Sequence, residues 1–400
     1  MRLFSMQPAH LFVAGLAVLC MAAPAVSHDL FVRNAGLDSA QCGGTQNACR
    51  TINRAIANAA SGDNIWVGPG RYGDLNGDGD LDDPQEEHLE QVGGVLCMIC
   101  IKKSIHLYSL FGPEVTLITG PAFRNPIGIA LVDIFASGVT IGGQGHGFTF
   151  RGGDRSVEAR NGLDWVRVIG NTALQAGYAA FSFTSLGHDL LIANNRVIGA
   201  GGRGFMIWGG EDGALIYRNV ADGGAYAGFW VVSGNGTPHQ VVENVASNNL
   251  YGFLMEQRTV VKNNSAIGNH VGIRLPGEDS AFPADTRIFG NTIAGNDYAG
   301  IEIMAASQGM AITRNNIYGN GTKGIETLVG SASGCGIVNY AAGGTIVNAT
   351  NNFWGSVSGP GSDPADKAGP GSGCDLGSGH TQVQPFSKTA FWVSPITSDW

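Results

Sequence analysis

A repeat of about 24 residues constrains the fold of this chain more than any other feature. Its segments begin with asparagine and carry a glycine and then an apolar residue eight or nine positions later. Successive glycines are separated by 24, 24, 20, 28 and 24 residues, and they are Gly204, Gly228, Gly252, Gly272, Gly300 and Gly324. Short alternating strands at this period predict one coil of a parallel β-solenoid per repeat. Leucine-rich repeats share the period but require a leucine consensus, which is missing.

Two columns of side chains are expected to stack along the solenoid, because its coils lie about 4.8 Å apart. Asparagine amides at one turn can form a ladder that satisfies buried polar groups. The ladder asparagines are Asn171, Asn195, Asn219, Asn244, Asn264, Asn291 and Asn315, and Asn351 opens a degenerate last copy. Ala180 holds the glycine place one repeat earlier, so the apolar column reads Phe181, Phe205, Phe229, Phe253, Ile273, Ile301 and Ile325.

Two segments give this solenoid a specific resemblance. "NNFWGSVSGPG" at 351–361 resembles the last coil of right-handed parallel β-helix proteins of the pectin-lyase-like superfamily. "GDNIWVGPGRY" at 62–72 resembles their first coil, which follows a capping helix. The preceding "CRTINRAIANAASGD" predicts that helix, with one apolar face made of Ile52, Ala55, Ile56, Ala59 and Ala60. The resemblance implies an all-β fold, a right-handed parallel β-helix (β-solenoid) with a short N-terminal capping helix.

The N-terminal segment of the chain indicates export. Arg2 precedes the apolar run "LFVAGLAVLCMAA", and small residues follow it, as in a secretory signal peptide. No other stretch is long and apolar enough to span a bilayer, so we expect a secreted or periplasmic protein. The expected organisation is a signal peptide (1–27), a cap with the first coil (28–72), an acidic insertion (73–90), β-helix coils (91–354) and a Gly- and Pro-rich closing segment (355–400), with 28–400 as one domain.

Six cysteines remain after the predicted signal peptide, which fits disulfide bonding in an oxidising compartment. Cys42–Cys49 and Cys335–Cys374 are plausible local pairs. Cys97 and Cys100 would face opposite sides of a regular strand, so a bridge between them requires a bulge. Zinc is the rival interpretation, but no second cysteine pair has a zinc-binding spacing.

The acidic stretch "DLNGDGDLDD" at 74–83 follows the calcium loop of EF-hands. Gly79 falls where such loops turn sharply, and the first glutamate comes one place later than the usual bidentate ligand. The predicted calcium ligands are Asp74, Asn76, Asp78, Asp80, Asp82 and Glu86. The alternative is a solvated acidic turn, because Asp, Asn and Gly favour turns on their own account.

Residues two and four places after each repeat glycine are expected to face outward. Trp208 and Trp230 then lie on adjacent coils and, with Glu256, are predicted to bind substrate, since flat aromatic side chains can stack on sugar rings. The alternative is a satellite core under a covering loop. A charged patch follows at Arg258, Arg274, Glu302 and Glu326, which we predict as candidate catalytic residues.

Several functions fit this charged patch. Stacked Glu302 and Glu326 would share a proton, bind calcium, or act as acid and nucleophile. In lyases of the superfamily an arginine or lysine takes the proton and calcium neutralises the uronate, which would make Arg274 or Arg258 the base. The plainer alternative is an ion-pair ladder between Arg274 and Glu302.

Two function classes therefore remain open. The first is a carbohydrate-active enzyme, foremost a calcium-dependent polysaccharide lyase and otherwise a glycoside hydrolase. The second is a non-catalytic envelope or extracellular protein that binds glycan or a partner, with calcium as a structural ion. The net charge of −9 argues against a nucleic-acid partner. The histidines show no metal-binding spacing, and the oligomeric state stays open.

Overall fold

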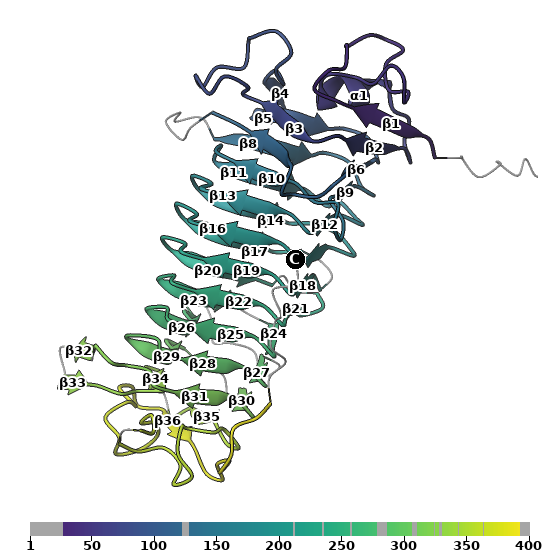
Figure 1. The fold of residues 1–400 in the computed structure, drawn as a ribbon. Coiled ribbons are helices and arrows are strands. Elements are labelled where there is room, and N and C mark those ends of the chain that lie inside the picture. Colours follow the sequence, from purple (N-terminus) through teal and green to yellow (C-terminus); the bar gives the residue numbers. More distant parts are fainter. Residues whose placement is uncertain are drawn as a thin grey trace, which may run out of the picture.

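The computed structural model describes residues 27–121, 128–210, 213–233, 236–256, 258–277, 286–305, 310–323, 325–327, 330–342, 344–362 and 364–392. All but the last residue of the predicted signal peptide lies outside these ranges. The chain winds into one elongated stack of coils (Figure 1). The helix α1 (Ile52–Asn58) and the strand β1 (Asp29–Val32) lie at one end of the stack, and the last strand, β36 (His380–Gln382), lies at the other.

Three long sheets run along this stack, and each coil from β2 (Asn64–Val67) to β34 (Ile337–Asn339) contributes one strand to each sheet in the order A, B, C, whereas the ends of the stack add further strands. Sheet A comprises β1, β2 (Asn64–Val67), β6 (His106–Ser109), β9 (Thr140–Ile141), β12 (Arg167–Ile169), β15 (Leu191–Ala193), β18 (Leu215–Tyr217), β21 (His239–Val242), β24 (Thr259–Lys262), β27 (Arg287–Phe289), β30 (Ala311–Thr313), β35 (Ile346–Asn348) and β36 (His380–Gln382). Sheet B comprises β3 (Gly70–Gly73), β7 (Thr116–Thr119), β10 (Thr149–Arg151), β13 (Thr172–Leu174), β16 (Arg196–Ile198), β19 (Val220–Asp222), β22 (Val245–Ser247), β25 (Ser265–Ile267), β28 (Thr292–Ala294) and β31 (Asn316–Tyr318).

Sheet C carries most of the side chains discussed below. It comprises β4 (Glu90–Val92), β5 (Val95–Ile101), β8 (Ile129–Ile134), β11 (Arg155–Arg160), β14 (Ala179–Thr184), β17 (Arg203–Trp208), β20 (Ala227–Val232), β23 (Tyr251–Glu256), β26 (Val271–Leu275), β29 (Ala299–Ile303) and β34 (Ile337–Asn339). Successive coils pair in parallel, for example β14 with β17 and β17 with β20. The predicted parallel β-helix is therefore confirmed.

The predicted asparagine ladder forms the corner between sheets A and B. The Oδ1 atom of Asn219 accepts bonds from the backbone N–H and the side-chain amide of Asn195, at 2.9 and 3.0 Å. The same pattern repeats from Asn171 to Asn315, so buried donors on each coil are satisfied by the next coil. The last member is Asn352, whereas Asn351 occupies the preceding left-handed position with φ 58°.

A second, unpredicted ladder forms the corner between sheets B and C. Asn249 bonds to Asn269, which bonds to Asn296, and Asn296 bonds to Asn320, in each case through both its backbone N–H and its amide. Asp366 ends this ladder by accepting from the amide of Asn320 at 2.7 Å. Both corners are therefore fixed by buried amides over the middle and C-terminal coils.

The apolar column inside sheet C is largely as predicted. Phe181, Phe205, Phe229 and Phe253 are fully buried, and successive ring centroids are 5.1, 4.7 and 4.9 Å apart. The column ends differently, because Ile337 and not Ile325 pairs with Ile301. Ile325 belongs to an antiparallel hairpin, β32 (Ile325–Thr327) with β33 (Gly330–Ala332), which projects from the coil.

Sheet C departs from simple alternation at the glycine place of the repeat. The pairing of β11 with β14 includes Arg155 and Val157 but passes over Ser156. Residues three apart across this place therefore share the outer face, where a regular strand would separate them. Cys97 and Cys100 span this place on β5 and form a disulfide. The irregularity that this pair required is thus a feature of the whole sheet.

The N-terminal end is closed by α1 and a disulfide-bonded loop. Thr51 caps the helix by accepting from the N–H of Arg54, and Ile52, Ala55 and Ile56 are buried. Ala59 is buried just beyond the helix, but Ala60 is exposed, so the predicted apolar face is one residue too long. The predicted Cys42–Cys49 and Cys335–Cys374 bridges are both present.

Candidate functional site

An exposed row of aromatic side chains follows the outer face of sheet C and its corner with sheet B. Tyr178, Trp208 and Tyr226 are 38%, 43% and 36% exposed, which is unusual for large aromatic residues in such number on one face. We call this row the aromatic strip, and its members are Tyr178, Arg203, Trp208, Tyr226, Trp230 and Tyr251. The irregular outer face of sheet C brings these residues together, because Arg203 precedes the glycine place and Trp230 follows it.

Arg203 lies at the centre of the strip. Its guanidinium carbon is 4.9 Å from the ring centre of Tyr178, 5.0 Å from that of Tyr226 and 4.1 Å from that of Trp230. Cation–π contacts of this kind attract a guanidinium to the faces of aromatic rings. No carboxylate among the described residues forms an ion pair with Arg203, and its buried Nε has no hydrogen-bond partner there. Its charge is therefore available to an anionic ligand.

The three predicted substrate-binding residues lie together in the strip. The rings of Trp208 and Trp230 are 4.8 Å apart at 75°. Trp230 is partly buried and donates from its indole nitrogen to Glu256 at 2.7 Å. The ring of Trp208 is therefore accessible to a ligand, and it packs against Trp230, which Glu256 holds in place through a hydrogen bond. Substrate binding by these three residues stays a prediction.

Arg274 and Glu302 form the ion pair that the plainer alternative predicted. Arg274 Nη1 is 2.7 Å from Glu302 Oε2 and donates to the Tyr251 hydroxyl at 3.0 Å. Glu302 is 5% exposed, and burial raises the pKa of its carboxyl, with Arg274 opposing the rise. Arg274 is therefore held against a buried carboxyl and not directed to solvent alone.

The predicted stacking of Glu302 on Glu326 is wrong. The next residue in that column is Val338, because β34 pairs with β29. Glu326 lies in the projecting hairpin opposite Ser331. The other predicted base, Arg258, lies beyond the end of β23 and donates to the carbonyl of Gly236 at 3.2 Å. The four predicted catalytic residues thus do not form one cluster.

A buried acidic pair at the N-terminal end of the strip escaped the sequence analysis. Asp133 on β8 and Glu158 on β11 are register partners, 0% and 4% exposed. Arg160 Nη2 lies 2.9 Å from Asp133 and 2.7 Å from Glu158, and Arg155 lies 3.2 Å from Glu158. Burial raises the pKa of Asp133 to about 7, and Glu158 adds to the rise. Buried ion pairs therefore border the aromatic strip at its N-terminal end.

A signal for this pair was present in the sequence. The outward column that contains Trp230 continues upstream through Ser182 to Glu158 and Asp133. The repeat becomes irregular before Ala180, so the glycine spacing alone does not reach these coils.

The acidic insertion places its predicted calcium ligands in two groups. Asp74 and Glu86 are buried and accept from the N–H groups of Gly77 and Leu75, at 2.5 and 2.6 Å. The exposed carboxylates of Asp78, Asp80 and Asp83 lie within 4.8 Å of one another. Asn76 donates to Asp78 at 2.8 Å and to Asp83 at 2.7 Å, and Asp82 donates from its N–H to Asp80. Asp83 joins the exposed group although the spacing did not single it out.

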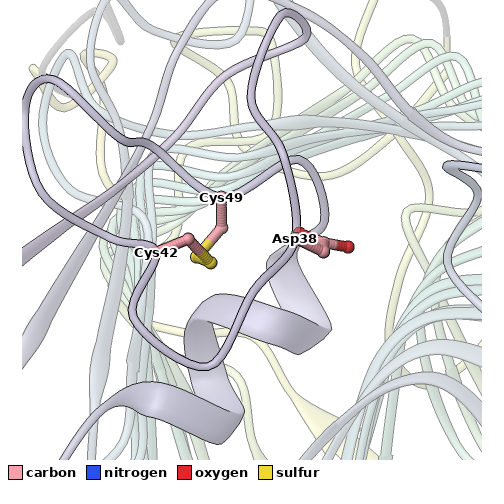
Figure 2. Close-up of side chains that lie close together, drawn as sticks. All are labelled: Asp38, Cys42 and Cys49. Atoms are coloured by element: carbon pink, nitrogen blue, oxygen red, sulfur yellow. A yellow bond between two sulfur atoms is a disulfide. The ribbon is translucent and has the colours of Figure 1, made fainter.

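Asp38, Cys42 and Cys49 also lie close together beside α1 (Figure 2). The two sulfur atoms form a disulfide, so they offer no thiolate to a metal. Asp38 accepts from the N–H groups of Arg50 and Thr51 at 2.8 and 3.0 Å. This cluster fastens the cap.

Two protein-family models match the chain. The model of the right handed β-helix region covers residues 133–286, and that of the periplasmic copper-binding protein NosD covers residues 221–358. A search of curated proteins found no match.

Several solved structures are similar. The A-module of a mannuronan C-5 epimerase from Azotobacter vinelandii shares 17% identity over 80% of this chain and 78% of its own, with a TM-score of 0.40. A rhamnogalacturonan lyase shares 10% identity over 90% and 88%, with a TM-score of 0.44. XylC in complex with xylose shares 13% over 78% and 75%, with a TM-score of 0.47.

Within the described part of 221–358, no three His, Cys, Asp or Glu side chains lie close enough to share an ion. His239 is buried and uses both ring nitrogens for backbone contacts, with Ala214 and Gly209. Copper prefers imidazole and sulfur ligands that can converge.

No helix among the described residues is long and apolar enough to cross a bilayer. The β-helix family model matches the central coils, where three parallel sheets stack coil upon coil. This chain is a right-handed parallel β-helix protein.

Proposed function

We propose that this protein binds a carbohydrate polymer along the aromatic strip. The observation that carries this proposal is the group of aromatic rings around Arg203, of which Tyr178 and Tyr226 are exposed. Arg203 is a cation without a carboxylate partner among the described residues. Aromatic rings offer apolar area to sugar rings with little side-chain entropy to lose. Arg203 adds a charged donor that can bind a carboxylate or sulfate on the polymer.

The direction of the strip supports a polymer as the ligand. Three coil steps separate Tyr178 from Tyr251, since β14, β17, β20 and β23 pair in sequence. At the usual strand spacing this distance is about 14 Å. A ligand that contacts the whole strip must therefore extend over several sugar rings along the axis of the β-helix.

Binding is proposed in preference to cleavage by Arg274. A general base must be unprotonated before it can accept a proton from the substrate, and a guanidinium keeps its proton in proteins. The guanidinium of Arg274 also contacts the buried carboxyl of Glu302 at 2.7 Å. The geometry therefore supports a structural ion pair for Arg274 beside the strip.

Two further features belong to this proposal. Three disulfides support action in an oxidising compartment, secreted or periplasmic, as the N-terminal signal pattern predicts. Calcium is proposed as a structural ion of the acidic insertion, supported by the convergence of Asp78, Asp80 and Asp83. Oxygen-rich turns of this kind suit calcium, which takes 6–8 oxygen ligands.

The test is retention of the purified protein in gels that contain pectate, alginate, chondroitin or a neutral glucan. We expect wild-type protein to be retarded by at least one polymer. Trp208→Ala should weaken retention several-fold, because it removes a large apolar contact area from the ligand. Trp392→Ala is the matched control, since Trp392 is 82% exposed near the C-terminal end. Equal retention of both variants, or no retention of wild type, would refute the proposal.

A further inference from the structure

His270 and Asp297 form an exposed pair in line with the aromatic strip. His270 lies on the corner between sheets B and C, where its neighbours on successive coils are Leu250 and Tyr298. Leu250 in turn follows Tyr226 on this corner. A polymer bound on the strip and continued along the same axis therefore reaches His270 two coils after Tyr226, which is about 10 Å away.

The contact between the two side chains fixes the tautomer of the imidazole. His270 Nδ1 is 2.5 Å from Asp297 Oδ1. An ionised carboxylate only accepts, so Nδ1 carries the proton and Nε2 holds a lone pair when the ring is neutral. The His270 side chain is 42% exposed, and no described residue forms a hydrogen bond with its Nε2. Such an oriented imidazole is the arrangement that general acid–base catalysis requires.

A cation lies at the same place. Lys323 Nζ is 2.5 Å from Asp297 Oδ2 and its side chain is 73% exposed. An ammonium group has three donors, so contact with Asp297 leaves donors for a second carboxylate. The ring of Tyr298 lies 5.1 Å from that of His270, and its hydroxyl contacts Tyr340 at 3.0 Å. The His270 imidazole, the Lys323 ammonium group and the Tyr298 ring therefore lie close together at the surface.

We propose that His270 is the acid–base residue of a β-elimination that cleaves an acidic polysaccharide, with Asp297 as its positioning residue and Lys323 as the contact for the uronate carboxylate. This inference rests on the proposed function, because the aromatic strip supplies the binding of the polymer. Arg203 and Lys323 are the two cations that would bind the carboxylates of the polymer.

The reaction needs no additional reactant. Nε2 of His270 removes the proton from the carbon that bears the carboxylate. The electron pair left on that carbon forms a double bond to the neighbouring ring carbon, and the bond from that neighbour to the glycosidic oxygen breaks. The protonated imidazole returns the proton to the departing oxygen. The products are one chain with an unsaturated uronate and one chain with a free hydroxyl.

The test follows the ultraviolet absorbance of unsaturated uronates with any acidic polymer that wild-type protein retains in the gel assay. We expect wild-type protein to raise the absorbance. His270→Gln should lower the rate by roughly 10²–10⁴-fold, the usual contribution of a general acid–base residue. The control His380→Gln, which changes an exposed histidine on β36, should leave the rate unchanged.

A positioning role for Asp297 predicts a change in pH dependence. Asp297→Asn should shift the pH profile of the rate, because it removes the negative charge in contact with His270. The other charged and titratable groups around His270 are Lys323, Tyr298, Glu302 and Arg274, which the variant retains. A merely structural role would lower the melting temperature and leave the profile in place.

The outcomes separate this inference from the proposed function. Retention of an acidic polymer by wild type without any rise in absorbance, or retention of the neutral glucan alone, overturns the His270 proposal and leaves binding intact. Cleavage at equal rates by wild type and a folded His270→Gln variant also overturns it. Absence of retention on every polymer overturns the proposed function itself.

Discussion

Asp366 closes the second asparagine ladder with a carboxylate where the preceding coils use an amide. It is 3% exposed and accepts from the backbone N–H and the side-chain amide of Asn320. Burial raises its pKa from 3.8 to about 6, and the bonds from Asn320 and Gly319 oppose the rise. Between pH 3.8 and about 6, this carboxyl is therefore protonated in the folded state and ionised in the unfolded chain. Stability falls as pH rises through this interval and is constant above it.

Replacing this carboxyl with an amide should remove that loss. Asp366→Asn keeps an acceptor for Asn320 and cannot ionise, so we expect it to stabilise the protein by on the order of 2 kcal/mol at pH 8. At pH 4 the variant and wild type should be nearly equal, because the native carboxyl is then protonated. Thermal melts at the two pH values measure this difference. A variant that melts below wild type at pH 8 would contradict the explanation.

At the scale of the elements, the acidic insertion is fastened to the capping helix. Glu87 is 1% exposed and accepts from the N–H groups of Ile52 and Asn53 at the start of α1, the latter at 3.0 Å. Glu86 holds the N–H of Leu75 within the same insertion. An ion bound in the loop would therefore stabilise the cap, which closes the β-helix at its N-terminal end.

Calcium should raise the melting temperature of wild-type protein relative to a chelator. The double variant Asp78→Asn with Asp80→Asn should lose most of this increase, because it removes two of the three clustered carboxylates. Asp189→Asn, the same type of substitution at an exposed aspartate outside the insertion, should keep it. Glycan retention should be unaffected in all variants, since the insertion lies at the end of the stack. Equal melting of wild type with and without calcium would eliminate the structural ion.

At the scale of the whole molecule, the repeat sets the architecture and local irregularities set the site. Spacing alone places Asn195 in its ladder and Phe205 in the core, because every coil must satisfy the same buried groups. It fails at Glu326, since a hairpin lengthens that coil and moves the residue out of the sheet. It also misses Arg203, which simple alternation assigns to the inner face and the irregular register turns outward.

The most direct test of the central claim is the affinity of wild-type protein for oligosaccharides of increasing length, cut from a polymer that it retains. Binding along the strip predicts that affinity rises with each added sugar at least until the ligand spans about 14 Å, the length from Tyr178 to Tyr251. Arg203→Gln should lower affinity for charged oligosaccharides at every length that reaches it. Affinity that is independent of length, or equal in Arg203→Gln and wild type, would contradict binding along the aromatic strip.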